Sequence, residues 1–192
     1  NDRNEQRLNS LAKEANKKRH QLEGLSKQLS KYLSPQVYES IFSGEKSVDV
    51  ASTRKKLTIF FSDLVGFTTL SENLQSEDLT GALNFYLNEM STIALDHGAT
   101  IDKYIGDAIM MFFGDPETHG VEEDAYRCVS MAVEMRKRLL ELESEWGSFG
   151  LQEPLKTRTG ISTGYCTVGN FGSENRLDYT VIGAGVNVAS RL

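Results

Sequence analysis

The sequence predicts an α+β domain with the ferredoxin-like (βαββαβ) order of elements, preceded by a long polar helix. The central observation is a hairpin, because two apolar, β-favouring runs flank Gly106-Asp107. Two segments with helical spacing of apolar residues, 76–98 and 121–142, lie on either side of it. A strand-like run precedes the first helix and another follows the second, which completes the order strand, helix, hairpin, helix, strand.

Length and composition describe one core domain with an appendage. The 192 residues are too few for two full enzymatic domains, and 25% charged with 39% hydrophobic residues is ordinary for a globular protein. A net charge of −6 argues against nucleic acid as a partner, since nucleic-acid-binding proteins usually present a basic face. The two cysteines, Cys128 and Cys166, lack metal or redox spacing, so we expect buried thiols in a reducing compartment.

No targeting or membrane segment is visible in the sequence. No apolar run approaches the ~20 residues that span a bilayer, and no signal peptide is recognisable. We therefore expect a cytoplasmic catalytic domain, while leaving open a membrane anchor upstream in the full-length protein.

Residues 1–33 predict a helix that forms a short parallel coiled coil. Apolar positions recur in steps of three and four with one polar insertion: Leu8, Leu11, Ala15, Lys18, Leu22, Leu25, Leu29 and Tyr32. Lys18, the polar residue in this series, weakens the apolar contact between the two helices of the coiled coil. The alternative is an amphipathic helix lying on its own domain. Ser34-Pro35 is expected to end the helix, and residues 34–54 form a connector whose second half, 44–54, is a polar linker.

The first strand, beginning near Lys56, ends on an acidic residue. Asp63 is followed by a turn through Gly66 into a helix, an arrangement that offers a metal ligand beside free backbone N–H groups. It outlines a site for a nucleotide triphosphate.

The second acidic position is Asp107, at the tip of the hairpin. The following run, 108–113, lacks polar alternation, which indicates a strand covered on both faces. A carboxylate there is costly without a partner, and a divalent metal is the usual one, although an ordinary Asp-containing turn is the alternative. Two carboxylates on adjacent strands suit Mg²⁺, which keeps waters and also takes phosphate oxygens.

The remaining elements complete the core. His97 and His119 lie near helix ends without metal-ligand spacing, so surface or capping roles are expected. Residues 155–168 read as a strand, 171–176 as a turn, 177–182 as the returning strand, and 185–192 as the start of a helix. Asn187 and Arg191 are four residues apart, which places both on one face of that helix.

Three blocks in this order, FFSDLVGFTTLSE, IDKYIGDAIMMFFGDP and DYTVIGAGVNVASRL, resemble the signature blocks of class III nucleotide cyclase catalytic domains. The resemblance runs from residue 55 to 192 and implies the palm-like cyclase homology fold. Segment 35–44 resembles the connector found before these domains, which implies an upstream sensor module that signals through the helix.

The resemblance also implies a site with two divalent metal ions, Mg²⁺ or Mn²⁺. Asp63 and Asp107 match the metal-binding acids, and the backbone carbonyl of Leu64 matches a further ligand. The substrate phosphates are expected to bind the backbone N–H groups of four residues, Val65, Gly66, Phe67 and Thr68.

The resemblance implies that Lys103 and Thr180 contact the base of the nucleotide and select it. Lys103 can only donate a hydrogen bond, so it suits adenine N1, an acceptor, and opposes guanine N1–H. Most adenylate cyclases of this class carry Asp where Thr180 stands, so the sequence resembles the Thr-bearing type IIIb subgroup. Members of that subgroup often respond to bicarbonate, which we take as a hypothesis for this chain.

The implied reaction converts ATP to 3′,5′-cyclic AMP and pyrophosphate, through in-line attack by the ribose 3′-oxygen. Asn187 matches the residue that orients the ribose, and Arg191 the one that neutralises charge on the transferring phosphorus. In the family the metal acids come from one subunit and these groups from the other, which implies a homodimer.

Two alternatives stay open. A guanylate cyclase is disfavoured because the family reads guanine with Glu at the position of Lys103. A non-catalytic cyclase-homology domain for dimerisation or regulation is disfavoured because both acids and the Asn/Arg pair are present. Family members continue past the position of Arg191, so we expect a C-terminally truncated domain, whose activity and dimerisation are left open.

Overall fold

The computed structural model describes residues 2–33, 35, 37–38, 51–173 and 175–191. The chain divides into two compact units, residues 1–45 and 46–192. Much of the predicted connector, residues 39–50, lies outside the described residues.

The first unit contains helix α1, Asp2–Leu29, followed by a 3₁₀ turn, η1, at Ser30–Tyr32. The helix therefore ends before Ser34-Pro35, because Leu33 is already extended at φ −118° and ψ 153°. Lys18 pairs with Glu14 at 3.1 Å, a local i,i+4 contact that gives this polar seam residue a partner. Several apolar residues of the predicted seam are more than half exposed: Leu11, Leu22, Leu25, Leu29 and Tyr32. The coiled coil itself stays a prediction.

The second unit is built on a five-stranded antiparallel sheet in the order β2-β3-β1-β4-β5. The strands are β1 (Ser52–Leu64), β2 (Thr100–Ile105), β3 (Ala108–Phe113), β4 (Thr157–Ser173) and β5 (Arg176–Ile182). The first four strands have the ferredoxin-like order, with the β2–β3 hairpin inserted beside β1, so the predicted fold class is confirmed.

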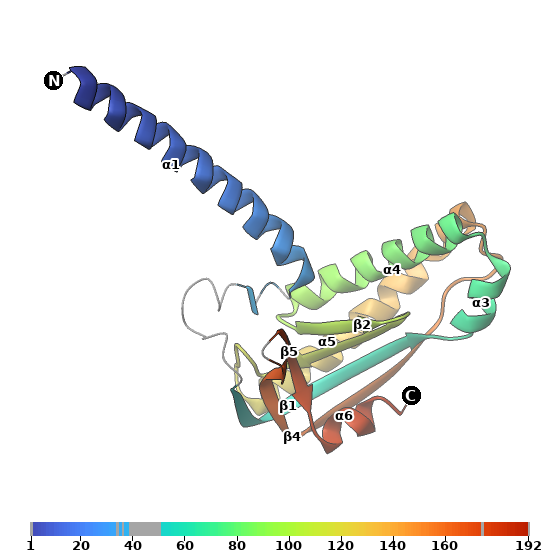
Figure 1. Ribbon diagram of the computed structural model, residues 1–192. Coiled ribbons are helices and arrows are strands. Elements are labelled where there is room, and N and C mark those ends of the chain that lie inside the picture. The colour runs from blue at the N-terminus through green and yellow to red at the C-terminus, as the bar shows by residue number, and fades with distance from the viewer. Residues whose placement is uncertain (1, 34, 36, 39–50, 174, 192) are drawn as a thin grey trace. The chain divides into compact units, whose positions relative to one another are not determined.

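Two long helices cover one face of this sheet (Figure 1). They are α4 (Ser76–Asp96) and α5 (Val121–Glu141), and a short helix, α3 (Phe67–Asn73), follows β1. Two 3₁₀ turns, η2 (Leu142–Ser144) and η3 (Trp146–Phe149), follow α5. Trp146 and Phe149 both pack against Phe85 of α4 with ring centroids 5.6 Å apart, so η3 is held against that helix.

The hydrophobic core has a separate cluster on each face of the sheet. The cluster under the two long helices includes Phe60, Tyr86, Met90, Met111, Met131 and Trp146. The second cluster joins β1 and β3 to β4, β5 and a short helix, α6 (Ala184–Ala189), through Leu57, Ile59, Phe112, Cys166 and Val181. Both cysteines are buried and free, as predicted, and burial raises the pKa of Cys128 to about 12.

Three boundaries differ from the sequence prediction. Strand β1 begins at Ser52, inside the predicted linker, because its polar first half pairs along its backbone with β4. Strand β4 runs to Ser173 through the predicted turn. Its glycines permit this, since a Cβ on Gly169 would overlap the Ala51 carbonyl. Helix α6 ends at Ala189, three residues before the predicted limit. None of the helices in the described part of the chain has the length and hydropathy needed to cross a lipid bilayer.

Candidate active site

The two predicted metal acids lie at neighbouring chain turns. Asp63 is the penultimate residue of β1, and Asp107 occupies the two-residue turn between β2 and β3 with Gly106, whose φ is 65°. Asp107 Oδ2 accepts a hydrogen bond from the Leu64 N–H at 2.8 Å. This bond fixes the Asp107 carboxylate beside the end of β1, and the position of Asp107 in the turn is the one that the hairpin signal predicted.

An arginine that the sequence analysis did not single out completes this group. Arg158 stands opposite Asp63 in the register of β4 and β1. Its Nε and one terminal nitrogen donate to the two oxygens of Asp63 at 3.1 and 3.0 Å. Such a two-pronged guanidinium contact matches carboxylate geometry and is also suited to phosphate. Only the strand register could have revealed it.

Tyr86 lies beneath the acids. The side chain is fully buried on α4, and its hydroxyl is 3.5 Å from Ser62 Oγ. Burial raises the pKa of Tyr86 to about 12, and the negative charges of Asp107 and Asp63 act in the same direction, against the hydrogen bond with Ser62. The phenol of Tyr86 therefore stays protonated and neutral near the two acids.

The donor set fits a divalent cation that is shared with a phosphorylated ligand. Among the described residues, no cluster of three or more His, Cys, Asp or Glu side chains is placed to hold a metal ion. Two carboxylates and a backbone carbonyl are too few for a closed site. They suit Mg²⁺ or Mn²⁺, which completes its oxygen shell with waters and substrate.

One of the four N–H groups of the predicted phosphate loop is already occupied by another partner. Gly66 has a φ of 72° and precedes α3, whose first turn lacks a side-chain cap in the part of the chain that the structure describes. The Val65 N–H, however, donates to the Lys156 carbonyl at 2.8 Å. The expectation that this N–H holds phosphate is therefore wrong, and Gly66, Phe67 and Thr68 remain the candidates.

The two predicted base-reading residues, Lys103 on β2 and Thr180 on β5, are brought together through an acid between them. Thr180 Oγ1 donates to Asp102 Oδ2 at 2.6 Å, and Lys103 Nζ lies 3.3 Å from Asp102 Oδ1. Lys103 also pairs with Asp178. Burial raises the pKa of Asp102, opposed by its hydrogen bond from Thr180 and by the charge of Lys103. The sequence analysis missed Asp102, because its partner is 78 positions away.

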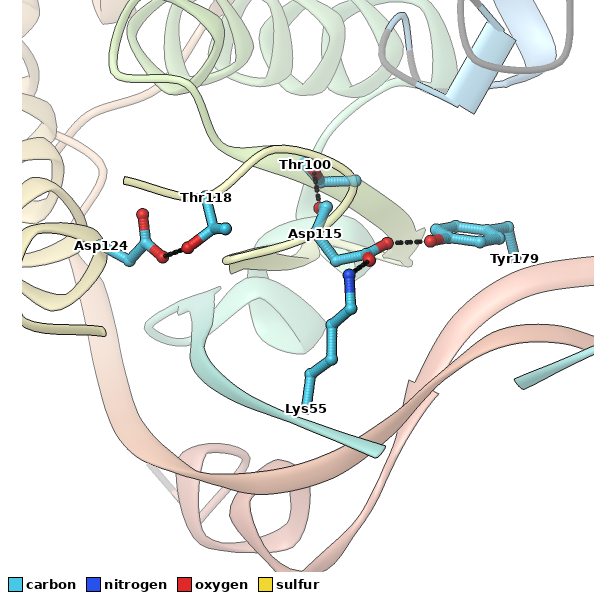
Figure 2. A network of polar contacts seen from close by, with 6 residues as sticks. All are labelled: Lys55, Thr100, Asp115, Thr118, Asp124 and Tyr179. Carbon is cyan, nitrogen blue, oxygen red and sulfur yellow. Dashed lines mark hydrogen bonds and ion pairs between the residues drawn. The ribbon is translucent and has the colours of Figure 1, made fainter. Parts of the chain in front are cut away.

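A second buried polar cluster anchors the same strand (Figure 2). Asp115, 2% exposed, is ion-paired with Lys55 of β1 and accepts a hydrogen bond from Tyr179, the neighbour of Thr180. Its backbone carbonyl accepts a hydrogen bond from Thr100 Oγ1 at 2.6 Å. This cluster ties β1, β2 and β5 to the turn after β3.

Asn187 and Arg191 are both exposed, but they do not share a helix face. Asn187 lies in α6, whereas Arg191 follows the helix end, and its N–H donates to the Val188 carbonyl at 3.3 Å. The predicted i,i+4 placement is therefore wrong, because α6 closes at Ala189.

The predicted residues thus form separate groups within one chain. Asp63, Leu64 and Asp107 converge at one end of the sheet, and Lys103 meets Thr180 through Asp102. Within the residues that the structure describes, no hydrogen bond or ion pair joins the first group to the second.

The comparison with protein families gives one match across most of the chain. The family described as the adenylate and guanylate cyclase catalytic domain matches residues 50–192. Adenylate cyclase 1 of Rhizobium meliloti is 38% identical over 144 residues, which cover 74% of this chain and 21% of that protein. The adenylate cyclase of Anabaena cylindrica is 37% identical over 83% of this chain and 30% of its own length.

Solved structures give the same result. The adenylyl cyclase CyaB of P. aeruginosa superposes with a TM-score of 0.71 and 58% identity, covering 74% of this chain and 72% of that one. The guanylyl cyclase Cya2 superposes with a TM-score of 0.69 and 42% identity, over 74% of this chain and 71% of its own. The chain spans less than a third of the length of the curated adenylate cyclases it matches.

Proposed function

The chain belongs to the adenylate and guanylate cyclase catalytic domain family, the class III nucleotide cyclases, and we propose that it is the catalytic region of an adenylate cyclase. The reaction is the conversion of ATP to 3′,5′-cyclic AMP and pyrophosphate. The observation that carries this proposal is the joining of Lys103 and Thr180, the two residues expected to read the base, into one hydrogen-bonded group through Asp102.

The chemistry forms one phosphorus–oxygen bond and breaks another. The ribose 3′-oxygen attacks the α-phosphorus in line and loses its proton, and pyrophosphate leaves with the electrons of the α–β bond. Divalent ions at Asp63, Asp107 and the Leu64 carbonyl, when bound, supply acidification of the 3′-hydroxyl and neutralisation of the triphosphate. Arg158 adds a fixed positive charge beside Asp63 at the same place.

The other residues position the substrate. The N–H groups of Gly66, Phe67 and Thr68 face a phosphate, and Asn187 orients the ribose. Arg191 stabilises negative charge that grows on the transferring phosphorus, a contribution that acts mainly in the transition state.

Adenine is favoured over guanine by the chemistry of Lys103. Its ammonium donates and cannot accept, so it suits the unprotonated N1 of adenine and opposes the N1–H of guanine. Asp178 and Asp102 hold this ammonium in place. A guanylate cyclase is the second candidate, supported by the structural likeness to the guanylyl cyclase Cya2. A non-catalytic cyclase-homology domain is the third.

The test is production of cyclic nucleotide from ATP and GTP with Mn²⁺ or Mg²⁺, measured on the full-length protein. We expect cyclic AMP from the wild type, none from Asp63→Ala, and loss of the ATP preference in Lys103→Glu. Cyclic GMP as the main product would favour the second candidate. No product from a folded, dimeric protein would favour the third.

We further propose a homodimer in which each site uses the metal acids of one subunit and the base, ribose and phosphorus contacts of the other. Mixing two inactive variants tests this arrangement. Asp63→Ala and Asn187→Ala damage opposite halves, so random pairing restores about a quarter of the sites. Continued absence of activity after subunit exchange would contradict the shared site.

We also propose that an upstream sensor regulates the domain through helix α1 and that bicarbonate affects its activity. We propose that α1 pairs with a second copy and transmits a signal by small subunit rotations. Replacing it by a flexible linker should then abolish regulation, and an assay at fixed pH with added bicarbonate tests that response.

A further inference from the structure

We propose that Asp102 determines the nucleotide specificity of this site, as a positioning residue that fixes the direction of the Thr180 hydroxyl. With its hydrogen committed to Asp102, the Thr180 oxygen faces the base only as a hydrogen-bond acceptor. The proposal rests on the proposed adenylate cyclase function and adds a residue to its base site.

Asp102 accepts two hydrogen bonds on one carboxylate oxygen, Oδ2, and its other oxygen faces the charge of Lys103. The Asp102 side chain is 0% exposed. Oδ2 accepts from Thr180 Oγ1 at 2.6 Å and from the Val181 N–H at 3.3 Å, while Oδ1 faces the Lys103 ammonium at 3.3 Å. An ionised carboxylate only accepts hydrogen bonds, so beside the positive charge of Lys103 the Thr180 hydroxyl donates to Asp102.

A local irregularity of β2 makes this contact possible. Consecutive residues of a regular strand point to opposite faces of the sheet. Here the pairing of β2 with β3 shifts register between Ile101 and Lys103, with Asp102 at the shift. Such a bulge redirects side chains. As a result, Asp102 and Lys103 both reach β5, the strand at the opposite edge of the sheet.

The direction of the hydroxyl matters because purines differ at position 6. A threonine hydroxyl has one hydrogen and two lone pairs. Adenine carries a 6-amino group, which donates to a lone pair of Thr180. Guanine carries a 6-oxo group, which needs a donor and meets a lone pair instead. Asp102 therefore makes Thr180 selective, although threonine by itself serves either base.

The experiment compares kcat/KM for ATP and GTP in the wild type and in Asp102→Ala, on the full-length protein. Removing the acceptor frees the Thr180 hydrogen to donate to a 6-oxo group. We expect the ATP-to-GTP ratio to fall about tenfold, the value of one hydrogen bond. Inosine triphosphate has the 6-oxo group of guanine and lacks its 2-amino group. Its kcat/KM relative to that of ATP should rise by the same factor as that of GTP.

A double-mutant cycle shows whether the effect passes through Thr180. Thr180→Val removes the hydroxyl and keeps the shape, so adding Asp102→Ala to it should leave the ratio unchanged within about twofold. A further tenfold fall on that background would overturn the proposal.

Asp178→Ala is the matched control for the Lys103 contact. It removes the other acidic partner of this ammonium and keeps the Thr180–Asp102 bond. We expect it to lower the ATP-to-GTP ratio by clearly less than Asp102→Ala does, because only the position of Lys103 is affected. An equal fall in Asp178→Ala and Asp102→Ala would place the effect on Lys103 and overturn the proposal.

Asp102→Asn guards against a variant that fails to fold. The asparagine carboxamide has nearly the volume of the aspartate carboxylate. When its oxygen faces Lys103, its NH₂ group faces Thr180 and donates to the hydroxyl oxygen. The hydrogen of the Thr180 hydroxyl is then again free to donate to the base. We expect a shift in the same direction as with Asp102→Ala. A folded Asp102→Asn protein that loses activity equally on both nucleotides would make Asp102 a structural residue only. Failure of the adenylate cyclase proposal is distinct, since the wild type itself would then make no cyclic AMP.

Discussion

Arg158 holds both carboxylate oxygens of Asp63, at 3.1 and 3.0 Å, across the pairing of β4 and β1. The same oxygens are the expected metal ligands. A cation that binds Asp63 would therefore share these oxygens with a guanidinium, whose positive charge opposes its binding.

Replacing Arg158 should strengthen metal binding in the absence of nucleotide. Exposed ion pairs contribute up to about 1 kcal/mol, and the side chains of Arg158 and Asp63 are 54% and 26% exposed. We expect Arg158→Gln to reach half-maximal thermal stabilisation at about two- to fivefold less Mn²⁺. Arg138→Gln removes a positive charge that pairs with Glu89 instead and should leave the Mn²⁺ midpoint unchanged. Equal shifts in both variants would attribute the effect to net charge.

Asp107 has one observed role, as the acceptor of the Leu64 N–H, and one proposed role, as a metal ligand, which substitutions can separate. Asp107→Asn keeps an acceptor for the Leu64 N–H but loses the charge, so cyclase activity should be abolished with little change in Tm. Asp107→Ala also loses the acceptor, and its free energy of unfolding should fall by about a further 1 kcal/mol. Thermal melting beside the activity assay checks both. Wild-type activity in Asp107→Asn would remove Asp107 from the metal site.

Tyr86 should make folding sensitive to alkaline pH. Its pKa is raised from 10.0 to about 12 in the folded protein, so the folded state holds the phenol proton more tightly than the unfolded state. This contribution to stability is complete below pH 10 and is lost as the pH rises towards 12, by about 2 kcal/mol. Urea unfolding of the wild type and of Tyr86→Phe across this range measures it.

The comparison of the two proteins isolates the phenol, because Cys128, whose pKa is also raised to about 12, is present in both. The stability of the wild type should fall relative to Tyr86→Phe as the pH rises. A constant difference between the two would show that Tyr86 does not titrate in this range.

Asp115 and Lys55 should contribute unequally to stability, although they form one ion pair. Asp115 is almost fully buried, and Asp115→Ala removes the acceptor from both Lys55 and Tyr179, which should lower the free energy of unfolding by about 2–3 kcal/mol. Lys55→Met leaves the buried Asp115 carboxylate without the cation that balances its charge, whereas Lys55, 38% exposed, can reach water when Asp115 is lost, so Lys55→Met should lower it by more, about 3–5 kcal/mol. Urea unfolding followed by the fluorescence of the single tryptophan, Trp146, compares them. Equal losses would contradict the asymmetry.

Local patterns in the sequence were enough to predict the elements of the fold. The amphipathic spacing of α4 and α5 and the Gly106-Asp107 turn are encoded within a few residues, so these elements were predicted close to their observed limits. The position of Asp107 in the turn followed from the same hairpin, whereas its contact with the end of β1 depends on the pairing of β1 with β3.

Contacts that depend on strand register could not be predicted in the same way. Arg158 meets Asp63 only because β4 pairs with β1 in one register, and Asp102 meets Thr180 only because β5 approaches β2. The Val65 N–H is occupied by a carbonyl from the segment before β4, far along the chain. Each of these contacts joins residues whose separation in sequence carries no periodic signal.

Asp102 has one more consequence, which concerns the solubility of the protein. Strand β5 lies at the edge of the sheet, and the unpaired N–H groups of edge strands are starting points for aggregation with other chains. The Val181 N–H on this edge donates to the buried carboxylate of Asp102 at 3.3 Å. One side chain therefore accepts a hydrogen bond from the Thr180 hydroxyl and also from a backbone N–H that an added strand would need for pairing.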